Sequence, residues 1–378
     1  MIPRTVYSEE HEMFRASVRR FVENEIVPYH EAWERDGIVS RDVWRAAGEN
    51  GLLCCDVPEQ YGGPGGDFLH IGIVIEELAR VEASGPAFHL HSGIVAPYIL
   101  NYASEAQKKE LLPGMCSGEL IGAIAMSEPG AGSDLASIRT QAVRDGDDYV
   151  IDGQKTFISN GQISDLIVTA CKTDPEAGAK GISLIVVRDG DDGFSRGRNL
   201  EKVGWKAQDT SELFYADVRV PTERLLGEEH HGFTYLMHEL AQERLIVAIR
   251  AAATIEAALE ETVTYTKDRE AFGKPIFGFQ NTRFKLAEVK TQTAVVRSFI
   301  DRLMELHVAG ELSADDAAMA KLFSTETMCR VLDECLQLFG GYGYMWEFPI
   351  ARAWAGQRVA RIAGGSSEVM KEIIARTL

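Results

Sequence analysis

The residue whose type and setting best suit acid–base chemistry is Glu243, in a long helical run rich in Ala, Leu and Glu. A carboxylate removes a weakly acidic proton well when a dry, apolar setting raises its pKa. Leu240, Ile246 and Val247 lie three or four residues away, so they share its helix face and would exclude water. Glu239, one turn earlier, would raise the pKa of Glu243 further if it points inward. Glu243 is our candidate general base, and the competing interpretation is a surface glutamate on an acidic helix.

A glycine-rich segment, residues 124–134, has the composition of a ligand-binding loop. Pro129, Gly130 and Gly132 force irregular backbone and expose main-chain N–H groups, which would suit a planar ring with polar edges or a phosphate. The segment lacks the third glycine of a dinucleotide fingerprint, and no βαβ unit surrounds it. A tight connection between two domains is the alternative interpretation.

Four further short segments combine glycine turns with aromatic, hydroxyl or basic side chains. Phe157 would flank an aromatic ring or belong to a core. Arg269, at a helix end, would grip a pyrophosphate or be a solvated terminal charge. Each segment alone is a weak signal. The four are residues 155–161, 269–276, 337–343 and 363–368.

In this order, the five segments resemble the acyl-CoA dehydrogenase family over essentially the whole chain. The resemblance implies an N-terminal α-helical domain, a middle antiparallel β domain and a C-terminal four-helix bundle. It also implies FAD held non-covalently at a subunit interface, and a homotetramer built as a dimer of dimers. The implied reaction is that of fatty acid β-oxidation, in which an acyl-CoA becomes its trans-2-enoyl form and electron-transfer flavoprotein receives the electrons.

The resemblance assigns cofactor-binding residues in three groups. Those along the flavin would be Ile124, Ala125, Met126, Ser127, Gly132 and Ser133, with Phe157, Ile158 and Ser159 on the opposite flank. Those that reach the FAD of a neighbouring subunit would be Arg269, Phe272, Gln280, Gln337, Leu338, Phe339, Gly340 and Gly341. Those that close over the cofactor would be Ser366, Ser367 and Glu368.

Substrate binding is assigned in the same way, to residues near the CoA moiety and around the base. They are Ser133, Ala179, Lys180, Thr234, Ala241, Gln242, Glu243, Arg244, Gly364 and Gly365.

One position departs from many members of the family. They carry the catalytic glutamate where this chain has Gly364. The isovaleryl and long-chain enzymes place it on a C-terminal helix instead, which matches Glu243. The long-chain type is the nearest resemblance, through Met345-Trp-Glu347, Gly364-Gly365 and Met370-Lys-Glu372. Small residues and a proline at the expected pocket base favour a long or branched acyl chain; they are Ser92, Gly93 and Pro97.

Two other functions compete with the dehydrogenase. An acyl-CoA oxidase would pass the electrons to oxygen, but oxidase relatives usually carry an extra C-terminal domain, and this chain has 378 residues. A flavin-binding subunit without its own activity would lack a base, whereas this chain offers Glu243.

The elements that must position these residues follow from periodicity. Apolar residues recur at helical intervals in residues 1–120, short β-rich runs with Asp-Gly turns fill residues 121–230, and long helical runs fill residues 231–378. We expect three domains with these bounds.

Composition excludes several classes. The net charge of −18 opposes binding to nucleic acid and to anionic membrane surfaces. The six cysteines lack zinc-ligand spacing, and the pairs His89/His91 and His230/His231 lack the spacing of a helical metal site, so we assign no metal. The sequence shows no signal peptide and no apolar run long enough to span a bilayer. We expect a cytoplasmic protein or a mature protein of an organellar matrix.

Overall fold

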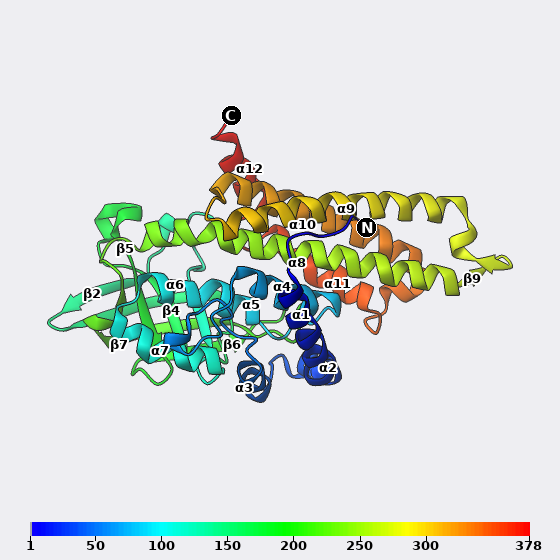
Figure 1. Ribbon diagram of the computed structural model, residues 1–378. Coiled ribbons are helices and arrows are strands. Elements are labelled where there is room, and N and C mark those ends of the chain that lie inside the picture. Colours follow the sequence, from blue (N-terminus) through cyan, green and yellow to red (C-terminus); the bar gives the residue numbers. More distant parts are fainter. Residues whose placement is uncertain (1) are drawn as a thin grey trace.

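The computed structural model describes residues 2–378, and its order is helical, then β, then helical, as expected (Figure 1). The α-helices of the first part pack around the middle of the molecule. They are α1 (Glu9–Phe21), α2 (Val27–Asp36), α3 (Arg41–Glu49), α4 (Phe68–Arg80), α5 (Phe88–Leu90), α6 (Ala96–Tyr102) and α7 (Glu105–Ser117). Helix α4 lies innermost, because its apolar residues at helical spacing are all buried, including Ile71, Val74, Ile75 and Leu78.

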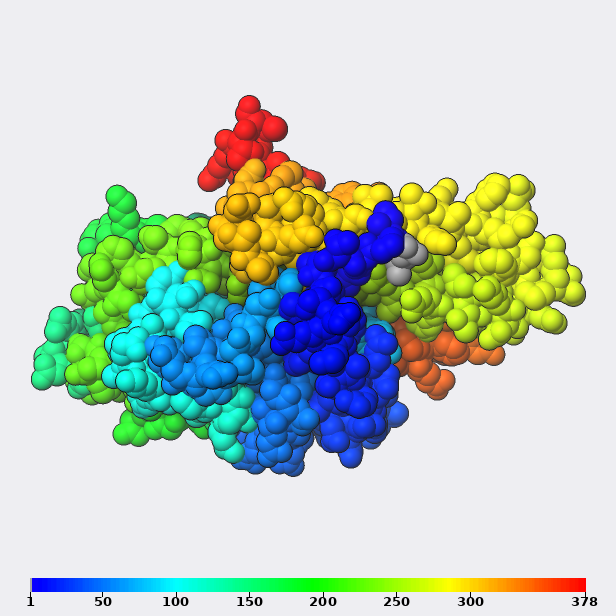
Figure 2. Space-filling view, in the orientation of Figure 1, coloured from blue at the N-terminus to red at the C-terminus, as the bar shows by residue number. Residues whose placement is uncertain are grey.

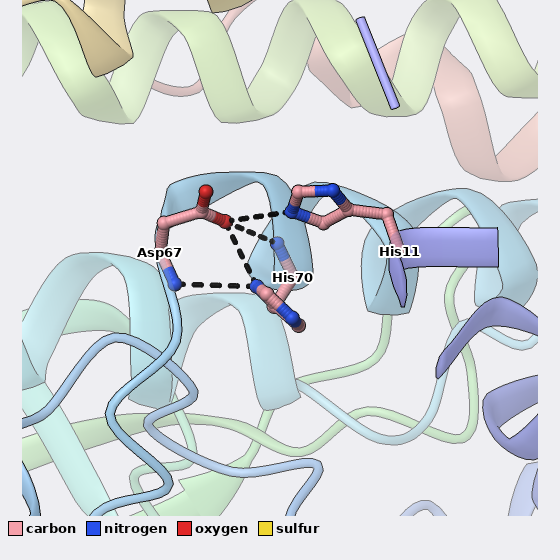
Figure 3. Close-up of side chains that lie close together, drawn as sticks. All are labelled: His11, Asp67 and His70. Carbon is pink, nitrogen blue, oxygen red and sulfur yellow. Dashed lines mark hydrogen bonds and ion pairs between the residues drawn. The ribbon is translucent and has the colours of Figure 1, made fainter. Parts of the chain in front are cut away.

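A polar cluster at the start of α4 fixes α1 against it (Figure 3). Asp67 caps α4 by accepting hydrogen bonds from the main-chain N–H groups of Leu69 and His70. His11 of α1 reaches the same carboxylate, with Nε2 3.2 Å from Oδ1, and His70 Nδ1 lies 2.8 Å from it. This grouping could not be predicted from local spacing, because His11 and Asp67 are 56 residues apart in the chain. The hydrogen bonds of Asp67 explain the cluster as the N-terminal cap of α4.

A buried ionic network ties the N-terminal segment to two domains. Glu76 of α4 is buried, and three guanidinium groups surround it, from Arg4, Arg15 and Arg297 at 2.8, 2.8 and 2.7 Å. Burial alone would raise the pKa of Glu76, but the three arginines outweigh burial and lower it to about 2. Glu76 is therefore ionised and compensated at neutral pH.

The middle of the chain forms one eight-stranded sheet. The strands are β1 (Gly122–Ala125), β2 (Gln141–Asp145), β3 (Asp148–Ser159), β4 (Leu166–Lys172), β5 (Ile182–Arg188), β6 (Phe194–Asn199), β7 (Thr210–Pro221) and β8 (Leu225–Leu226). Their order is β6-β7-β3-β2-β4-β5-β8, and β1 pairs with β4. Most pairs are antiparallel as expected, but β1–β4 and β2–β4 are parallel. The sheet is therefore mixed, because β1 enters from the helical domain alongside β4.

Long helices make up the last part of the chain. They are α8 (Gly232–Asp268), α9 (Gln280–Val308), α10 (Ala314–Phe339), α11 (Pro349–Gln357) and α12 (Ser367–Ala375). Helix α8 has 37 residues, which corresponds to about 55 Å, and it runs from the sheet to the far end of the molecule (Figure 1). There it leads into a small hairpin of β9 (Glu270–Ala271) and β10 (Lys274–Pro275). Helix α12 and the C-terminus project from the body (Figure 2).

None of the helices in residues 2–378 combines the length and apolar character that a membrane crossing needs.

Candidate active site

Glu243 lies in the buried first half of α8, and its side chain has one close partner. Tyr98 of α6 donates a hydrogen bond from its hydroxyl to Glu243 Oε1 at 2.9 Å. Burial raises the pKa of Glu243 to about 7, against the opposing effect of this hydrogen bond. A carboxyl group with this pKa is divided between its acid and base forms near neutral pH, as a general base requires.

Two charged side chains act on Glu243: Glu239, which the sequence suggested, and Arg244, whose charge the sequence analysis did not consider. Glu239 does point inward, where Asn101 Nδ2 and Tyr102 Oη donate to its Oε1 at 3.0 and 2.8 Å, and its charge adds to the raised pKa of Glu243. Arg244 is also buried, and burial lowers its pKa although Glu243 opposes this. The base therefore lies in a desolvated row of charged groups on α8.

The turn before α12 lies beside Glu243. A Cβ atom at Gly364 would lie 3.8 Å from Cγ2 of Val247, one helical turn after the base. Gly364 and Gly365 both have positive φ, at 67° and 96°. The buried Lys321 of α10 donates to the carbonyl oxygen of Gly365 and so fixes this turn. Gly364, the position of the base in many family members, therefore lies against the turn of α8 that follows Glu243.

The two segments predicted along the flavin lie side by side, and a buried ion pair connects them. Lys155 of β3 donates from Nζ to Met126 O at 3.0 Å and to Glu128 Oε1 at 2.9 Å. Thr156 N donates to Ser127 O at 3.0 Å. Because Lys155 is buried, this pair fixes the loop after β1 against the end of β3.

The exposed faces of these segments suit a flat ligand. Phe157, two residues before the end of β3, has φ +61° and is 71% exposed, although Lys155, Thr156 and Ile158 around it are buried. A Cβ atom at Gly130 or Gly132 would meet nothing within 4 Å, so the loop surface is open. Ile158, in contrast, is buried in the core of the sheet, so only its main chain is available to a ligand.

A second group of predicted cofactor residues surrounds a surface hollow of about 510 Å³ at the other end of α8. Arg269 ends α8 there, and its guanidinium carbon lies 5.8 Å from the ring centre of Tyr342. The predicted residues in the hollow are Arg269, Gln337, Leu338, Phe339, Gly340 and Gly341. Phe272, in the turn between β9 and β10, is 96% exposed and has φ +53°.

The two groups lie far apart within one chain. Arg269 follows Glu243 by 26 residues, so the helix rise separates them by about 39 Å. The structure does not bring them together around one ligand within a single chain.

The other predicted residues fall into five places. On the first turns of α8 are Thr234, Ala241 and Gln242, and Gln242 Nε2 donates to Gly93 O at 2.7 Å. In the 3-10 turn before β5 are Ala179 and Lys180. Ser366 caps α12, Ser367 is buried against Glu326, and Glu368 is exposed, while Gln280 begins α9 and Ser133 lies on the exposed loop after β1.

Two side chains of the site were not predicted from the sequence, and one glycine has a different role from the one expected. Tyr98 lies 145 residues from Glu243 and Lys155 lies 27 residues from Glu128, so no local spacing links them. Gly93 was expected to leave room in the pocket, but a Cβ atom there would lie 2.6 Å from Ile246 Cδ1. Gly93 therefore permits close packing against α8.

The chain thus combines a helical–β–helical order with a buried glutamate whose pKa is raised to about 7, as in an enzyme that removes a proton from a bound ligand. Family models match all three parts of the chain. Models of the N-terminal, middle and C-terminal domains of acyl-CoA dehydrogenase match residues 8–119, 123–218 and 230–378.

Relatives and solved structures point to the same family. The chain is 50% identical over 377 residues to long-chain specific acyl-CoA dehydrogenase, mitochondrial, of Sus scrofa, which covers 99% of this chain and 88% of that protein. An acyl-CoA dehydrogenase structure from Geobacillus kaustophilus is 51% identical, with TM-score 0.98 and 99% of each chain covered. A glutaryl-CoA dehydrogenase of Mycobacterium smegmatis in complex with FADH2 is 27% identical, with TM-score 0.91 and 98% and 95% covered.

The chain belongs to the acyl-CoA dehydrogenase family, and it is an FAD-dependent oxidoreductase. Its own residues fit that cofactor. The exposed Phe157, the open glycine loop and the arginine at the end of α8 offer an aromatic face, main-chain donors and a cation for a pyrophosphate.

Proposed function

We propose that this chain oxidises acyl-CoA thioesters to trans-2-enoyl-CoA, with Glu243 as the base, and that long or branched acyl chains are its substrates. The observation that carries the proposal is the buried Glu243 carboxyl, whose pKa burial raises to about 7 beside the turn at Gly364. The direct test is anaerobic bleaching of the yellow enzyme by a panel of straight and branched acyl-CoAs.

In this mechanism the protein holds the acyl group with its Cα next to the Glu243 carboxylate, which takes the α-proton. The loop of residues 124–134 and Phe157 would hold FAD, which would supply the electron sink for the hydride that leaves Cβ. Apolar neighbours of Glu243 on α8 exclude water, so the carboxylate is not stabilised by solvent and remains basic enough. Tyr98 fixes the orientation of the carboxylate, and burial raises the pKa of Tyr98 well above its ordinary value, so it remains a donor.

The electron acceptor that we propose is electron-transfer flavoprotein. A slow reaction of the reduced enzyme with air supports this over an oxidase, and a rapid reaction contradicts it. Bleaching of the flavin by any acyl-CoA also contradicts the interpretation of the chain as a non-catalytic flavin-binding subunit.

Replacement of Tyr98 tests the pKa assignment. Flavin reduction requires ionised Glu243, so its rate should rise with pH, with a midpoint near the pKa of about 7. Tyr98→Phe removes a hydrogen bond that lowers this pKa, so the midpoint should move to higher pH. Rapid-mixing measurements of flavin reduction across pH report the midpoint. Tyr344→Phe, at a residue 86% exposed, is the control. An unchanged or lower midpoint in Tyr98→Phe would contradict the assignment.

Replacement of Arg269 tests the second group of residues. We propose that Arg269 and Gln337–Gly341 bind the FAD of a neighbouring subunit in a homotetramer. Arg269→Ala removes a charge-assisted partner worth about 1.5–3 kcal/mol, so FAD should bind roughly 10- to 100-fold more weakly. Fluorescence titration of the apoprotein with FAD measures this. Arg302→Ala, on the exposed side of α9, should retain FAD normally. Equal retention in both variants would refute the assignment.

A further inference from the structure

A row of polar groups continues along α8 beyond Glu243, and the proposed mechanism does not use it. Arg250 follows Glu243 by seven residues, with Val247 between them, so all three side chains lie on one face of the helix. The rise of the helix places Arg250 about 10.5 Å further along this face.

Arg250 is a buried cation without a hydrogen-bonding partner in the described chain, although the charge of Glu82 acts on it. Its side chain is 5% exposed, and among residues 2–378 no hydrogen bond or ion pair involves its guanidinium group. The guanidinium carbon lies 4.8 Å from the ring centre of Trp205, whose own Nε1 is also buried and unpaired. A buried guanidinium that lacks a hydrogen-bonding partner is costly, so this arrangement points to an acceptor from outside the chain.

Other polar atoms meet at the same place from different elements. His89 of α5 leaves Nδ1 buried and unpaired, and burial together with the nearby charge of Arg250 lowers the pKa of His89 to about 3. Gln357 of α11 donates to Glu82 at 3.1 Å and leaves its own Oε1 unpaired. The buried Glu82 carboxylate forms no hydrogen bond with Arg250, but its charge opposes the lowering of the pKa of Arg250 by burial. The group therefore brings together several buried polar atoms that form no hydrogen bond within the chain, those of the Arg250 guanidinium among them.

The burial of α8 indicates the direction in which we infer that an acyl chain runs from Glu243. Before the base, Met237 is 40% exposed and His238 is 76% exposed on its side chain, so this side leads to solvent and suits the CoA part. After the base, Leu245, Ile246 and Ile249 are fully buried. The apolar chain therefore extends toward Arg250.

We propose that Arg250 binds an oxygen group, a carboxylate or a hydroxyl, at the far end of the acyl chain. The substrate class is then an ω-oxygenated acyl-CoA. An extended chain advances about 1.25 Å per carbon, from bonds of about 1.5 Å, so 10.5 Å corresponds to an acyl group of about ten carbons. This inference rests on the proposed function, because it requires the acyl Cα to lie at Glu243.

The test compares three substrates of one length with the holoenzyme: decanoyl-CoA, ω-hydroxydecanoyl-CoA and the mono-CoA ester of decanedioic acid. In the unaltered enzyme, kcat/KM should be higher for an oxygenated substrate than for decanoyl-CoA. Arg250→Leu should reduce this preference about 10- to 100-fold, as loss of a charge-assisted hydrogen bond does. Arg198→Leu, at an exposed position on β6, is the matched control and should keep the preference.

The outcomes separate the two proposals. Equal or greater kcat/KM for decanoyl-CoA in the unaltered enzyme overturns the inference and leaves the proposed function in place. A preference that survives in Arg250→Leu also overturns it. Failure of every acyl-CoA to bleach the flavin overturns both. If Arg250→Leu does not fold, the unaltered enzyme and Arg250→Lys decide, and Arg250→Lys should keep part of the preference.

Discussion

Glu243→Gln should abolish reduction of the flavin by acyl-CoA while the protein keeps its fold and its FAD. The amide has nearly the shape of the carboxyl group, and Tyr98 can still donate to its oxygen, but an amide does not accept the α-proton. Loss of a general base typically reduces the rate by about 10²–10⁴. Anaerobic rapid mixing with acyl-CoA measures the loss. Glu260→Gln, an exposed position on the same helix, should reduce flavin normally.

Moving the base to another position tests the assignment of Glu243 independently. The double variant Glu243→Gly with Gly364→Glu places a carboxylate on the turn that faces Val247. A glutamate at φ +67° is strained, at a cost of about 1–3 kcal/mol, but nothing closer than 3.8 Å obstructs its Cβ. Some activity should therefore return. Normal bleaching in Glu243→Gln alone would show that another residue is the base.

Glu76→Leu should destabilise the protein by about 3–5 kcal/mol, because it leaves three buried or half-buried guanidinium groups without their shared carboxylate. Urea unfolding of the holoprotein, followed by circular dichroism, measures the change. Glu31→Ala breaks the pair with Arg35, in which both side chains are largely exposed, and should cost less than about 1 kcal/mol. Equal effects in the two variants would show that the network does not stabilise the fold.

The same network predicts the direction of acid sensitivity. The pKa of Glu76 is lower in the folded protein, about 2, than in an unfolded chain, so its contribution is complete above the unfolded pKa. That contribution is lost as pH falls toward 2. In Glu76→Leu this part of the acid dependence should be missing.

Local spacing predicted those features of the site that one helix contains. Glu243 and Ile246 are buried on one face of α8, as periodicity predicted, while Leu240 and Val247 on the same face are half-buried. The order of helical and β segments was confirmed for the same reason. The flavin-binding segments were assigned only through their resemblance to family motifs, because each segment taken alone had another interpretation.

Features that depend on long-range packing escaped prediction. Tyr98 meets Glu243 only because α6 packs on α8, and Lys155 meets Glu128 only because β3 passes the loop after β1. The parallel pairing of β1 with β4 depends on where the chain enters the sheet, which no turn signal records. Ile158 alternates inward along β3, so a residue within a binding motif became part of the core.

Helix α8 carries the base near one end and Arg269 at the other, about 39 Å apart. If each end serves a different cofactor, a variant lacking Glu243 and a variant lacking Arg269 damage different halves of a shared site. A cell that makes both defective copies would assemble some mixed oligomers in which one site receives its base from the second copy and its arginine from the first. Two alleles that are each inactive alone would then complement one another, whereas two alleles with lesions at the same end of the helix would not.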